Sequence, residues 1–141
     1  MPSASATVFS PASPEAVFRH LAVAEAWPVW MRLSVARARR ATAGTPDPNG
    51  VGAVRAIFPV KEKVVAYEPS THYAYVMIGF TPIRNYRADV RLTPKNGGTE
   101  IEYAASGEGP GAGAVLRFAT RTLAKLLAGH ASRCKPGCPA H

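Results

Sequence analysis

The strongest constraint on the fold is a pair of alternating segments joined by a tight turn. Apolar and charged residues alternate through residues 85–93 and again through residues 99–105. Residues 95–98, Lys-Asn-Gly-Gly, are a hairpin signal, because Asn-Gly readily adopts the positive φ angles of a two-residue turn. Short connections of this kind force antiparallel neighbours, and an antiparallel sheet with one apolar face needs a cover.

A long amphipathic segment follows and is suited to be that cover. From Ala114 to about Ala131, apolar residues mark one face at helical spacing, whereas Arg117, Arg121 and Lys125 mark another. We therefore predict an α+β fold in which a curved antiparallel sheet of about seven strands wraps around this helix. A curved sheet around a helix leaves room for an apolar cavity between them.

The N-terminal residues predict a strand followed by two short helices. Residues 4–10 are prone to form a strand, and Ser13 is a good N-cap for the helix that follows. Pro14 suits the first helical position, and Glu15 suits the positive end of the helix dipole. We expect the second short helix within residues 24–30.

The middle of the chain predicts further strands separated by turns rich in Pro and Gly. In one of them, Val54, Ala56 and Phe58 share a parity that we interpret as inward, which places Arg55 outward. The expected strands are residues 33–40, 52–58, 61–68 and 72–79.

Length and composition fit one globular domain. The chain has 141 residues, of which 47% are hydrophobic and 18% charged, and this mixture excludes a wholly disordered chain. We expect the domain to span residues 1–131 and residues 132–141 to form a disordered tail. The first residues lack the pattern of a secretory signal, so we expect a cytoplasmic protein with reduced thiols.

A net charge of +8 raises the question of an anionic partner. No helix-turn-helix, RNP or zinc-finger motif accompanies the basic residues, so we expect no nucleic-acid binding. A solvated basic surface is the simpler interpretation, and attraction to an anionic membrane surface or an acidic partner is the alternative. Strand parity places the following residues outward: Arg37, Arg39, Arg55, Arg87 and Arg91.

Several segments together resemble a known superfamily. They are residues 13–18 (SPEAVF), 27–30 (WPVW), 50–55 (GVGAVR), 61–69 (KEKVVAYEP), 73–75 (YAY) and 97–101 (GGTEI). This pattern is similar to the START/Bet v 1-like (SRPBCC) superfamily, and within it to bacterial polyketide cyclase/dehydrase-like proteins. The resemblance covers roughly residues 5–131 and implies the helix-grip fold. For function it leaves lipid carriers, hormone receptors and aromatase/cyclases open.

The inward positions define a candidate ligand cavity. Tyrosines among them would place a few polar groups in an apolar pocket, which is the usual composition of a ligand site, although the same residues could simply fill the core. The predicted lining is Trp27, Trp30, Met31, Val54, Phe58, Tyr73, Tyr75, Met77, Tyr86, Val90, Ile101, Tyr103, Leu116, Thr120 and Leu123.

The weak candidates for a catalytic role are Glu62, Tyr75, Tyr86 and Tyr103. Glu62 shares the parity of Val64, so an inward side chain would be a buried carboxylate suited to acid–base chemistry. The alternative is a solvated strand end or a pair with a neighbouring arginine. No nucleophilic triad is apparent.

The C-terminal cysteines give a poor metal signal. Cys134 and Cys138, with His130 and His141, have a suggestive spacing, but the sequence lacks a second cysteine pair and a rigid framework. We therefore predict no metal, no cofactor and two ordinary thiols. His20 falls on the first predicted helix, and we expect it to be exposed.

Three hypotheses for function remain. The first is binding of a small hydrophobic or amphipathic ligand, lipid-like or polyketide-like, between the sheet and the C-terminal helix. The second is a cyclase/dehydrase enzyme acting on an aromatic or polyketide substrate. The third is an interaction protein that uses its basic surface. A monomer and a homodimer are both compatible with the sequence.

Overall fold

The computed structural model describes residues 2–31, 37–57, 60–79, 81, 83–134 and 138–140. It confirms the predicted helix-grip fold, a seven-stranded antiparallel sheet with a long C-terminal helix. The elements are β1 (Ser3–Ser10), α1 (Pro14–Ala22), the 3-10 helix η1 (Ala24–Ala26), α2 (Trp27–Trp30), β2 (Ala38–Thr42), β3 (Val54–Ile57), β4 (Val60–Glu68), β5 (His72–Ile78), β6 (Arg84–Lys95), β7 (Gly98–Glu108) and α3 (Ala112–Ser132).

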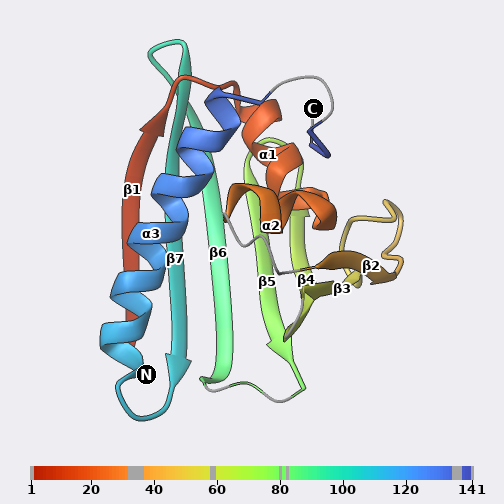
Figure 1. Cartoon of the computed structure of the whole chain (residues 1–141), viewed down its shortest axis with the longest axis vertical. Coiled ribbons are helices and arrows are strands. Elements are labelled where there is room, and N and C mark those ends of the chain that lie inside the picture. The colour runs from red at the N-terminus through yellow and green to blue at the C-terminus, as the bar shows by residue number, and fades with distance from the viewer. Residues whose placement is uncertain are drawn as a thin grey trace.

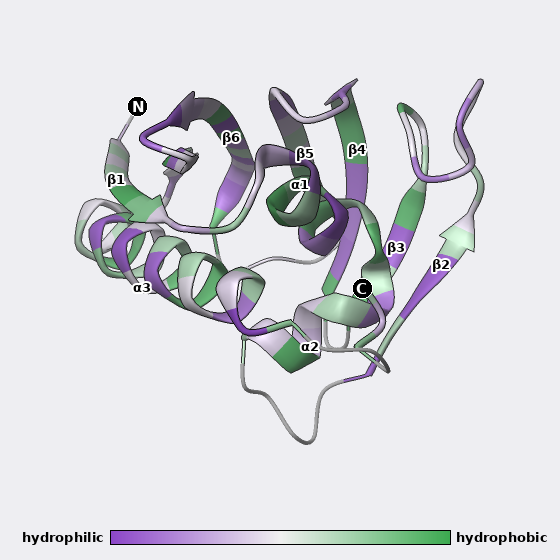
Figure 2. Ribbon diagram, turned by 90° about the horizontal axis from the view of Figure 1, so that it is seen from above, coloured by the Kyte–Doolittle hydropathy of each residue, from purple (hydrophilic) through white to green (hydrophobic). Residues whose placement is uncertain are grey.

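The sheet has the strand order β1-β7-β6-β5-β4-β3-β2, so the first strand closes one edge beside the last strand. α3 lies along β1 and β7, whereas α1 and α2 lie in front of the middle strands (Figure 1). The view from above shows that all three helices lie on the same, concave side of the sheet (Figure 2). The core and any enclosed cavity must therefore lie between the sheet and these helices.

The hairpin between β6 and β7 forms where the sequence predicts it. Lys95 pairs with Gly98, and the two turn residues, Asn96 and Gly97, have φ angles of 50° and 77°. Positive φ at both positions is the requirement of a tight hairpin turn. A Cβ at Gly98 would overlap the carbonyl oxygen of Ser10, so this glycine also allows β1 to end close to the hairpin.

The first helix begins as predicted, but one of its residues lies elsewhere than expected. The Ser13 hydroxyl accepts a hydrogen bond from the Ala16 amide at 3.2 Å, which is the N-cap interaction. The prediction that His20 is exposed is wrong, because His20 is fully buried. It lies three residues after Val17 and beside Leu21, on the apolar face of α1, where α3 also packs.

α3 covers the sheet with the stripe of buried residues that its periodicity predicts. Leu116, Thr120, Ala124 and Leu127 follow at helical spacing and are buried. The Ser10 hydroxyl donates to the carbonyl oxygen of Ala128 at 2.8 Å and ties the end of β1 to this helix.

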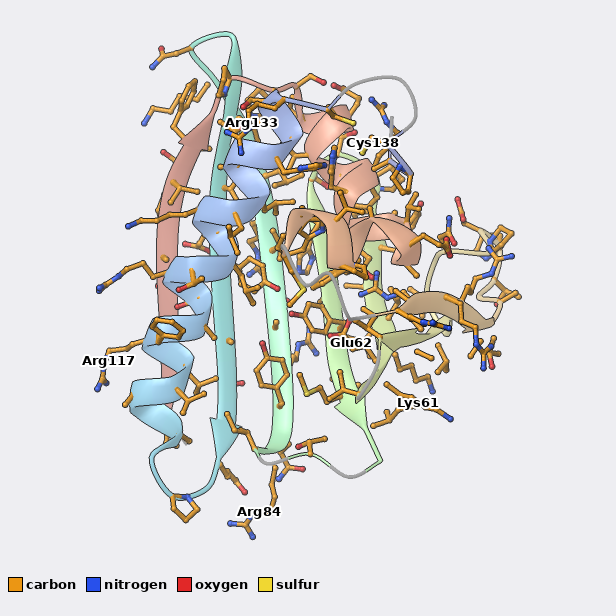
Figure 3. The ribbon with its side chains drawn as sticks, in the orientation of Figure 1. Lys61, Glu62, Arg84, Arg117, Arg133 and Cys138 are labelled. Carbon is orange, nitrogen blue, oxygen red and sulfur yellow. The ribbon has the colours of Figure 1, made fainter. Side chains whose placement is uncertain are left out.

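The opposite face of α3 carries exposed cations. Arg117, Arg121 and Lys125 are all exposed, and Arg117 points away from the sheet (Figure 3). Binding of this surface to an anionic membrane or an acidic partner stays a prediction. Among the described residues, no helix is long and apolar enough to cross a membrane.

The predicted parity of β3 is wrong. Arg55 is 1% exposed and points into the core with Ala53 and Ile57, whereas Val54 is only half-buried. Apolar residues flank Arg55 in the sequence, so the alternation predicted an outward arginine. In the structure, the register pairs Arg55 directly with Glu62 of β4, and the ion pair makes an inward arginine tolerable. Phe58 lies outside the described residues.

In the described part of the strand predicted over residues 33–40, β2 begins at Ala38 and extends to Thr42, two residues beyond the predicted end. Residues 32–36 lie outside the described part of the chain. In the predicted tail, residues 138–140 lie beside α1, and the Arg19 Nε donates to the carbonyl oxygen of Ala140 at 3.2 Å. The proposed division at residue 131 stays a prediction.

Candidate ligand-binding cavity

An apolar cavity of about 260 Å³ lies between the middle strands, α2 and the N-terminal half of α3. Val115 both lines this cavity and is 50% exposed, so the cavity reaches the surface beside the first turns of α3. The lining residues are Trp27, Met31, Ile57, Val60, Glu62, Tyr75, Met77, Ile83, Tyr86, Val115, Ala119 and Leu123.

The cavity includes part of the predicted lining. The predicted residues that line it are Trp27, Met31, Tyr75, Met77, Tyr86 and Leu123, together with the catalytic candidate Glu62. Other predicted residues are buried in the core but do not line this cavity: Trp30, Tyr73, Val90, Ile101, Tyr103, Leu116 and Thr120. Val54 is half-buried and lies outside the lining.

The structure also adds lining residues that the sequence analysis missed. Val115 and Ala119 lie eight and four residues before the predicted Leu123 and form with it one stripe of α3, beside the deeper stripe that contains Leu116. Their four-residue spacing within the predicted helix could have identified these lining residues from the sequence. Ile83 comes from the connection before β6, where no periodicity marks it.

A buried ion pair stands at the wall of the cavity. The Arg55 guanidinium donates to the Glu62 carboxylate at 2.7 Å, and the two side chains are 1% and 5% exposed. The same guanidinium donates to the carbonyl oxygen of Leu21 at 2.6 Å, which links β3 to the end of α1. Glu62 points inward beneath α2, whereas its neighbour Lys61 points outward (Figure 3).

Aromatic rings enclose the arginine. The Arg55 guanidinium carbon lies 4.7 Å from the Trp27 ring centroid and 5.1 Å from that of Tyr73, both within the range of cation–π attraction. The Trp27 indole donates to the Leu21 carbonyl oxygen at 2.9 Å, so this one oxygen holds both Trp27 and Arg55 in place. Glu62 is therefore bound to an arginine whose own position is fixed by a backbone carbonyl and two aromatic rings.

The environment of Glu62 changes its proton affinity. Burial raises the pKa of Glu62, and the charge and hydrogen bond of Arg55 offset part of that rise. Burial alone would lower the pKa of Arg55, but neighbouring Tyr73 and Glu62 keep it above its usual value, so the guanidinium stays charged. Glu62 thus holds a proton more readily than an exposed glutamate does.

Three tyrosine hydroxyls lie near this carboxylate. The hydroxyls of Tyr75 and Tyr103 are hydrogen-bonded at 2.5 Å, and burial raises the pKa of both well above the usual value. Burial also raises the pKa of Tyr86 to about 12, and its ring centroid lies 6.1 Å from that of Tyr75. Tyr75 and Tyr86 line the cavity, whereas Tyr103 does not. All three hydroxyls are neutral hydrogen-bonding groups at physiological pH.

A second, wider hollow of about 560 Å³ lies on the outer face of the sheet. Its charged residues already bind one another, since the Arg87 Nε donates to Asp89 at 2.9 Å and His72 contacts the same carboxylate at 2.7 Å. Arg84 is exposed at the start of β6, and its side chain points away from the cavity (Figure 3). The apolar cavity between the sheet and the helices is therefore the better candidate site.

A family comparison agrees with this geometry. Residues 1–135 match the family described as polyketide cyclase / dehydrase and lipid transport. The chain belongs to this family. The match spans nearly the whole chain and confirms the resemblance to the SRPBCC superfamily. No curated protein is similar enough to count as a match.

Solved structures of the superfamily share the fold at low sequence identity. A START superfamily protein from Mycobacterium smegmatis has a TM-score of 0.79 and 14% identity, with 93% of this chain and 97% of that chain covered. A protein from Nitrosospira multiformis has a TM-score of 0.72 and 22% identity, with 92% and 95% covered. DynU16, described as a putative protein in the dynemicin biosynthetic locus, has a TM-score of 0.70 and 17% identity, with 100% of this chain and 50% of that chain covered.

Proposed function

We propose that this protein binds a small, mostly apolar molecule with one polar group in the cavity between its sheet and α3. The observation that supports this most strongly is the buried carboxylate of Glu62 on the wall of a mostly apolar cavity. A few polar groups in an apolar pocket fix the orientation of a ligand, while the apolar surface provides most of the affinity. Tyr75 and Tyr86 supply further hydrogen-bonding groups.

The volume limits the size of the ligand. At the packing density of protein interiors, about 0.74, a cavity of about 260 Å³ holds roughly ten to twelve non-hydrogen atoms. A fused two-ring aromatic alcohol or an acyl chain of about ten carbons has this size. A hydroxyl on the ligand would donate to Glu62, which favours the aromatic alcohol.

The binding hypothesis is tested with 1-naphthol and decanoic acid as probes. We expect 1-naphthol, at about a hundred times its Kd, to raise the Tm by roughly 5–10 °C. Ala119→Trp would fill the cavity and abolish this shift, because Ala119 lines the cavity. Ala114→Trp is the matched control, since Ala114 is an exposed alanine on the same helix. The hypothesis fails if neither probe shifts the Tm, or if the two variants respond alike.

A second function, cyclase or dehydrase catalysis, is favoured by one specific observation. The pKa of Glu62 is raised by burial, and Glu62 shares a wall with the hydroxyls of Tyr75 and Tyr86. In an intramolecular aldol condensation, Glu62 would take the proton from a carbon between two carbonyls, and a tyrosine hydroxyl would hydrogen-bond the developing enolate. The carbanion then attacks a third, more distant carbonyl carbon of the same chain, and the oxygen of that carbonyl takes up the proton from Glu62. Loss of this hydroxyl with a second proton from the attacking carbon, as water, forms the C=C bond.

The enzyme hypothesis has its own test. A short linear polyketone that fits the cavity should cyclise faster with the protein, as measured by the absorbance of the aromatic product. Glu62→Gln should lower that rate by about 100-fold or more, the usual contribution of a general base, while 1-naphthol still binds. A rate that Glu62→Gln leaves unchanged removes Glu62 from the chemistry. Binding without any acceleration favours the carrier.

A further inference from the structure

Side chains from distant parts of the sequence meet where α1, the end of α3 and residues 138–140 come together. His20 comes from α1, His130 from the last turn of α3, and Cys134 and Cys138 from the residues that follow. The ligand atoms of His20, Cys134 and Cys138 all lie within 4.8 Å of one another. Cys138 stands beside α1 (Figure 3).

The distances around Cys138 match those of a metal centre. Its sulfur lies 3.5 Å from the Nε2 of His130 and 4.0 Å from the Nε2 of His20. In a tetrahedral Zn²⁺ site, Zn–S bonds of about 2.3 Å and Zn–N bonds of about 2.0–2.1 Å place sulfur and nitrogen ligands about 3.6 Å apart. The two Cys138 distances differ from this value by 0.1 and 0.4 Å, whereas Cys134 lies within 4.8 Å of the His20 and Cys138 ligand atoms and would have to move closer to complete the geometry.

The histidine at the centre of the cluster is already oriented as a ligand. The Nδ1 of His20 lies 2.7 Å from the carbonyl oxygen of Ala16, which can only accept a hydrogen bond. Nδ1 must therefore carry the proton, and Nε2, which faces Cys138, has a free lone pair. A backbone carbonyl that fixes the tautomer in this way is the usual outer-shell partner of a metal-binding histidine.

The charges also suit a metal. A ligand histidine needs an unprotonated nitrogen, and the contact between Nδ1 and the Ala16 carbonyl oxygen leaves Nε2 as that nitrogen. The His20 and His130 rings have their centroids 5.2 Å apart, an arrangement that disfavours two protonated rings. Two thiolates would neutralise the charge of a divalent ion.

We propose that His20, His130, Cys134 and Cys138 form a structural site for a thiophilic divalent metal, with Zn²⁺ as the best fit. Two sulfur and two nitrogen ligands are the donor set of closed, tetrahedral zinc sites. Because the protein supplies four ligands, the site leaves no position for a substrate. The metal would join α1, the end of α3 and residue 138 of the tail.

A catalytic cysteine explains the same cluster less well. A nucleophilic cysteine needs one activating base beside it, whereas Cys138 lies near two histidines and a second thiol. The metal would have to displace these thiol protons, so its binding should weaken as the pH falls. The site is independent of the cavity, and its test does not depend on the proposed function.

The experiment uses the full chain, reduced and stripped of metal by a chelator, and then titrated with Zn²⁺ or Co²⁺. We expect one equivalent of Zn²⁺ to bind and to raise the Tm by roughly 5–15 °C, with Mg²⁺ as the inactive control. Co²⁺ should give the intense visible absorption of a tetrahedral ion and a sulfur-to-cobalt charge-transfer band. These spectra report the ligand set directly.

Substitution of each proposed ligand tests which residues bind the metal. Cys134→Ser, Cys138→Ser and His130→Gln should each weaken Zn²⁺ binding by at least roughly 100-fold. His72→Gln is the matched control, because His72 lies on β5 and pairs with Asp89, away from the cluster. His20 is fully buried, so a His20 variant that fails to fold would be uninformative. The test therefore uses the Cys134, Cys138 and His130 variants.

Three results would overturn the proposal. The first is a Co²⁺ spectrum that stays that of the hydrated ion, with no change of Tm in Zn²⁺. The second is equal weakening in His72→Gln, which would indicate adventitious binding. The third is a disulfide between Cys134 and Cys138 in the purified protein, seen by mass spectrometry, with no metal uptake after reduction.

Discussion

Replacing Arg55 with methionine tests whether Glu62 is as buried and as dependent on its partner as the geometry indicates. Methionine keeps most of the volume of the arginine stem and can pack between the Trp27 and Tyr73 rings. The Leu21 carbonyl loses the arginine but keeps the Trp27 indole as a donor. The main effect of Arg55→Met is therefore a buried carboxylate without a counter-charge.

The expected magnitude depends on pH. Removing one partner of a buried ion pair costs about 3–5 kcal/mol when the remaining charge stays ionised. When Glu62 is protonated, only the hydrogen bonds are lost, at about 1–2 kcal/mol. We therefore expect Arg55→Met to lose about 3–5 kcal/mol at pH 8 and clearly less at pH 5.

The sign follows from the direction of the pKa shift. The pKa of Glu62 is raised in the folded protein, so the folded state binds the proton more tightly than the unfolded state does. The corresponding stability is present below the unfolded pKa of about 4.3 and is lost as the pH rises through the folded value. Arg55→Met removes the positive charge that limits the rise in the pKa of Glu62. The pKa of Glu62 is therefore higher in the folded variant, and the loss of folding stability continues to a higher pH.

Urea unfolding at pH 5, 6.5 and 8 measures the effect, with the free energy of the wild type subtracted at each pH. The double variant Arg55→Met/Glu62→Leu is the control, since replacing both charges with apolar groups can be neutral or stabilising. It should unfold within about 1 kcal/mol of the wild type. A single-variant loss that is the same at pH 5 and pH 8 would refute the burial of an ionisable Glu62.

Three further predictions concern the framework around the site. Leu116→Ala on α3 should cost about 3–4 kcal/mol in urea unfolding, because Leu116 is fully buried; a loss below about 1 kcal/mol would contradict its place in the core. Ser10→Ala should cost about 1–2 kcal/mol, since the Ser10 hydroxyl donates to a carbonyl oxygen of α3 at 2.8 Å in a buried position. Burial would raise the pKa of Asp89, but hydrogen bonds from Arg87 and His72 lower it overall. Asp89→Asn should therefore be less stable than the wild type at pH 7, and the difference should shrink as the pH falls below the unfolded pKa of about 3.9 and through the lowered folded pKa, as measured by Tm across that range.

The architecture could be predicted because its signals are local. The alternation through β6 and β7, the turn at Asn96 and the periodicity of α3 each concern residues close in sequence, and each predicts its element directly. Once an antiparallel sheet and one long apolar helix are expected, few arrangements bury both apolar surfaces. The helix-grip fold follows with little further information.

The site could be predicted only in part because it depends on register between strands. Parity indicated that Glu62 shares a face with Val64, and both are buried. The same method failed for Arg55, because an arginine between Val54 and Ala56 resembles an ordinary outward residue until its partner across the strand is known. A charge pair across two strands has no signature within either strand alone.

The cluster around Cys138 illustrates the same difficulty over a longer distance. His20 and Cys138 are separated by 118 positions in the sequence, and His20 looked like an exposed residue of a short helix. The spacing of His130, Cys134 and Cys138 was visible, but the buried imidazole that completes the set was not. Only the packing of α1 against α3 places it there.

Two buried polar atoms near the ion pair lack hydrogen-bond partners, which indicates that this region is not arranged for stability alone. Among the described residues, the buried side-chain atoms that have no hydrogen-bond partner are Arg55 Nε and the Tyr73 hydroxyl, and both belong to the surroundings of the ion pair. Each unsatisfied group costs about 1–3 kcal/mol, and an apolar pair at positions 55 and 62 would avoid at least the first of these costs. A region that carries such costs beside a cavity is typical of a functional site. The carboxylate of Glu62 is the group that this arrangement presents to the cavity, so a ligand or substrate should interact with Glu62 before any other polar group.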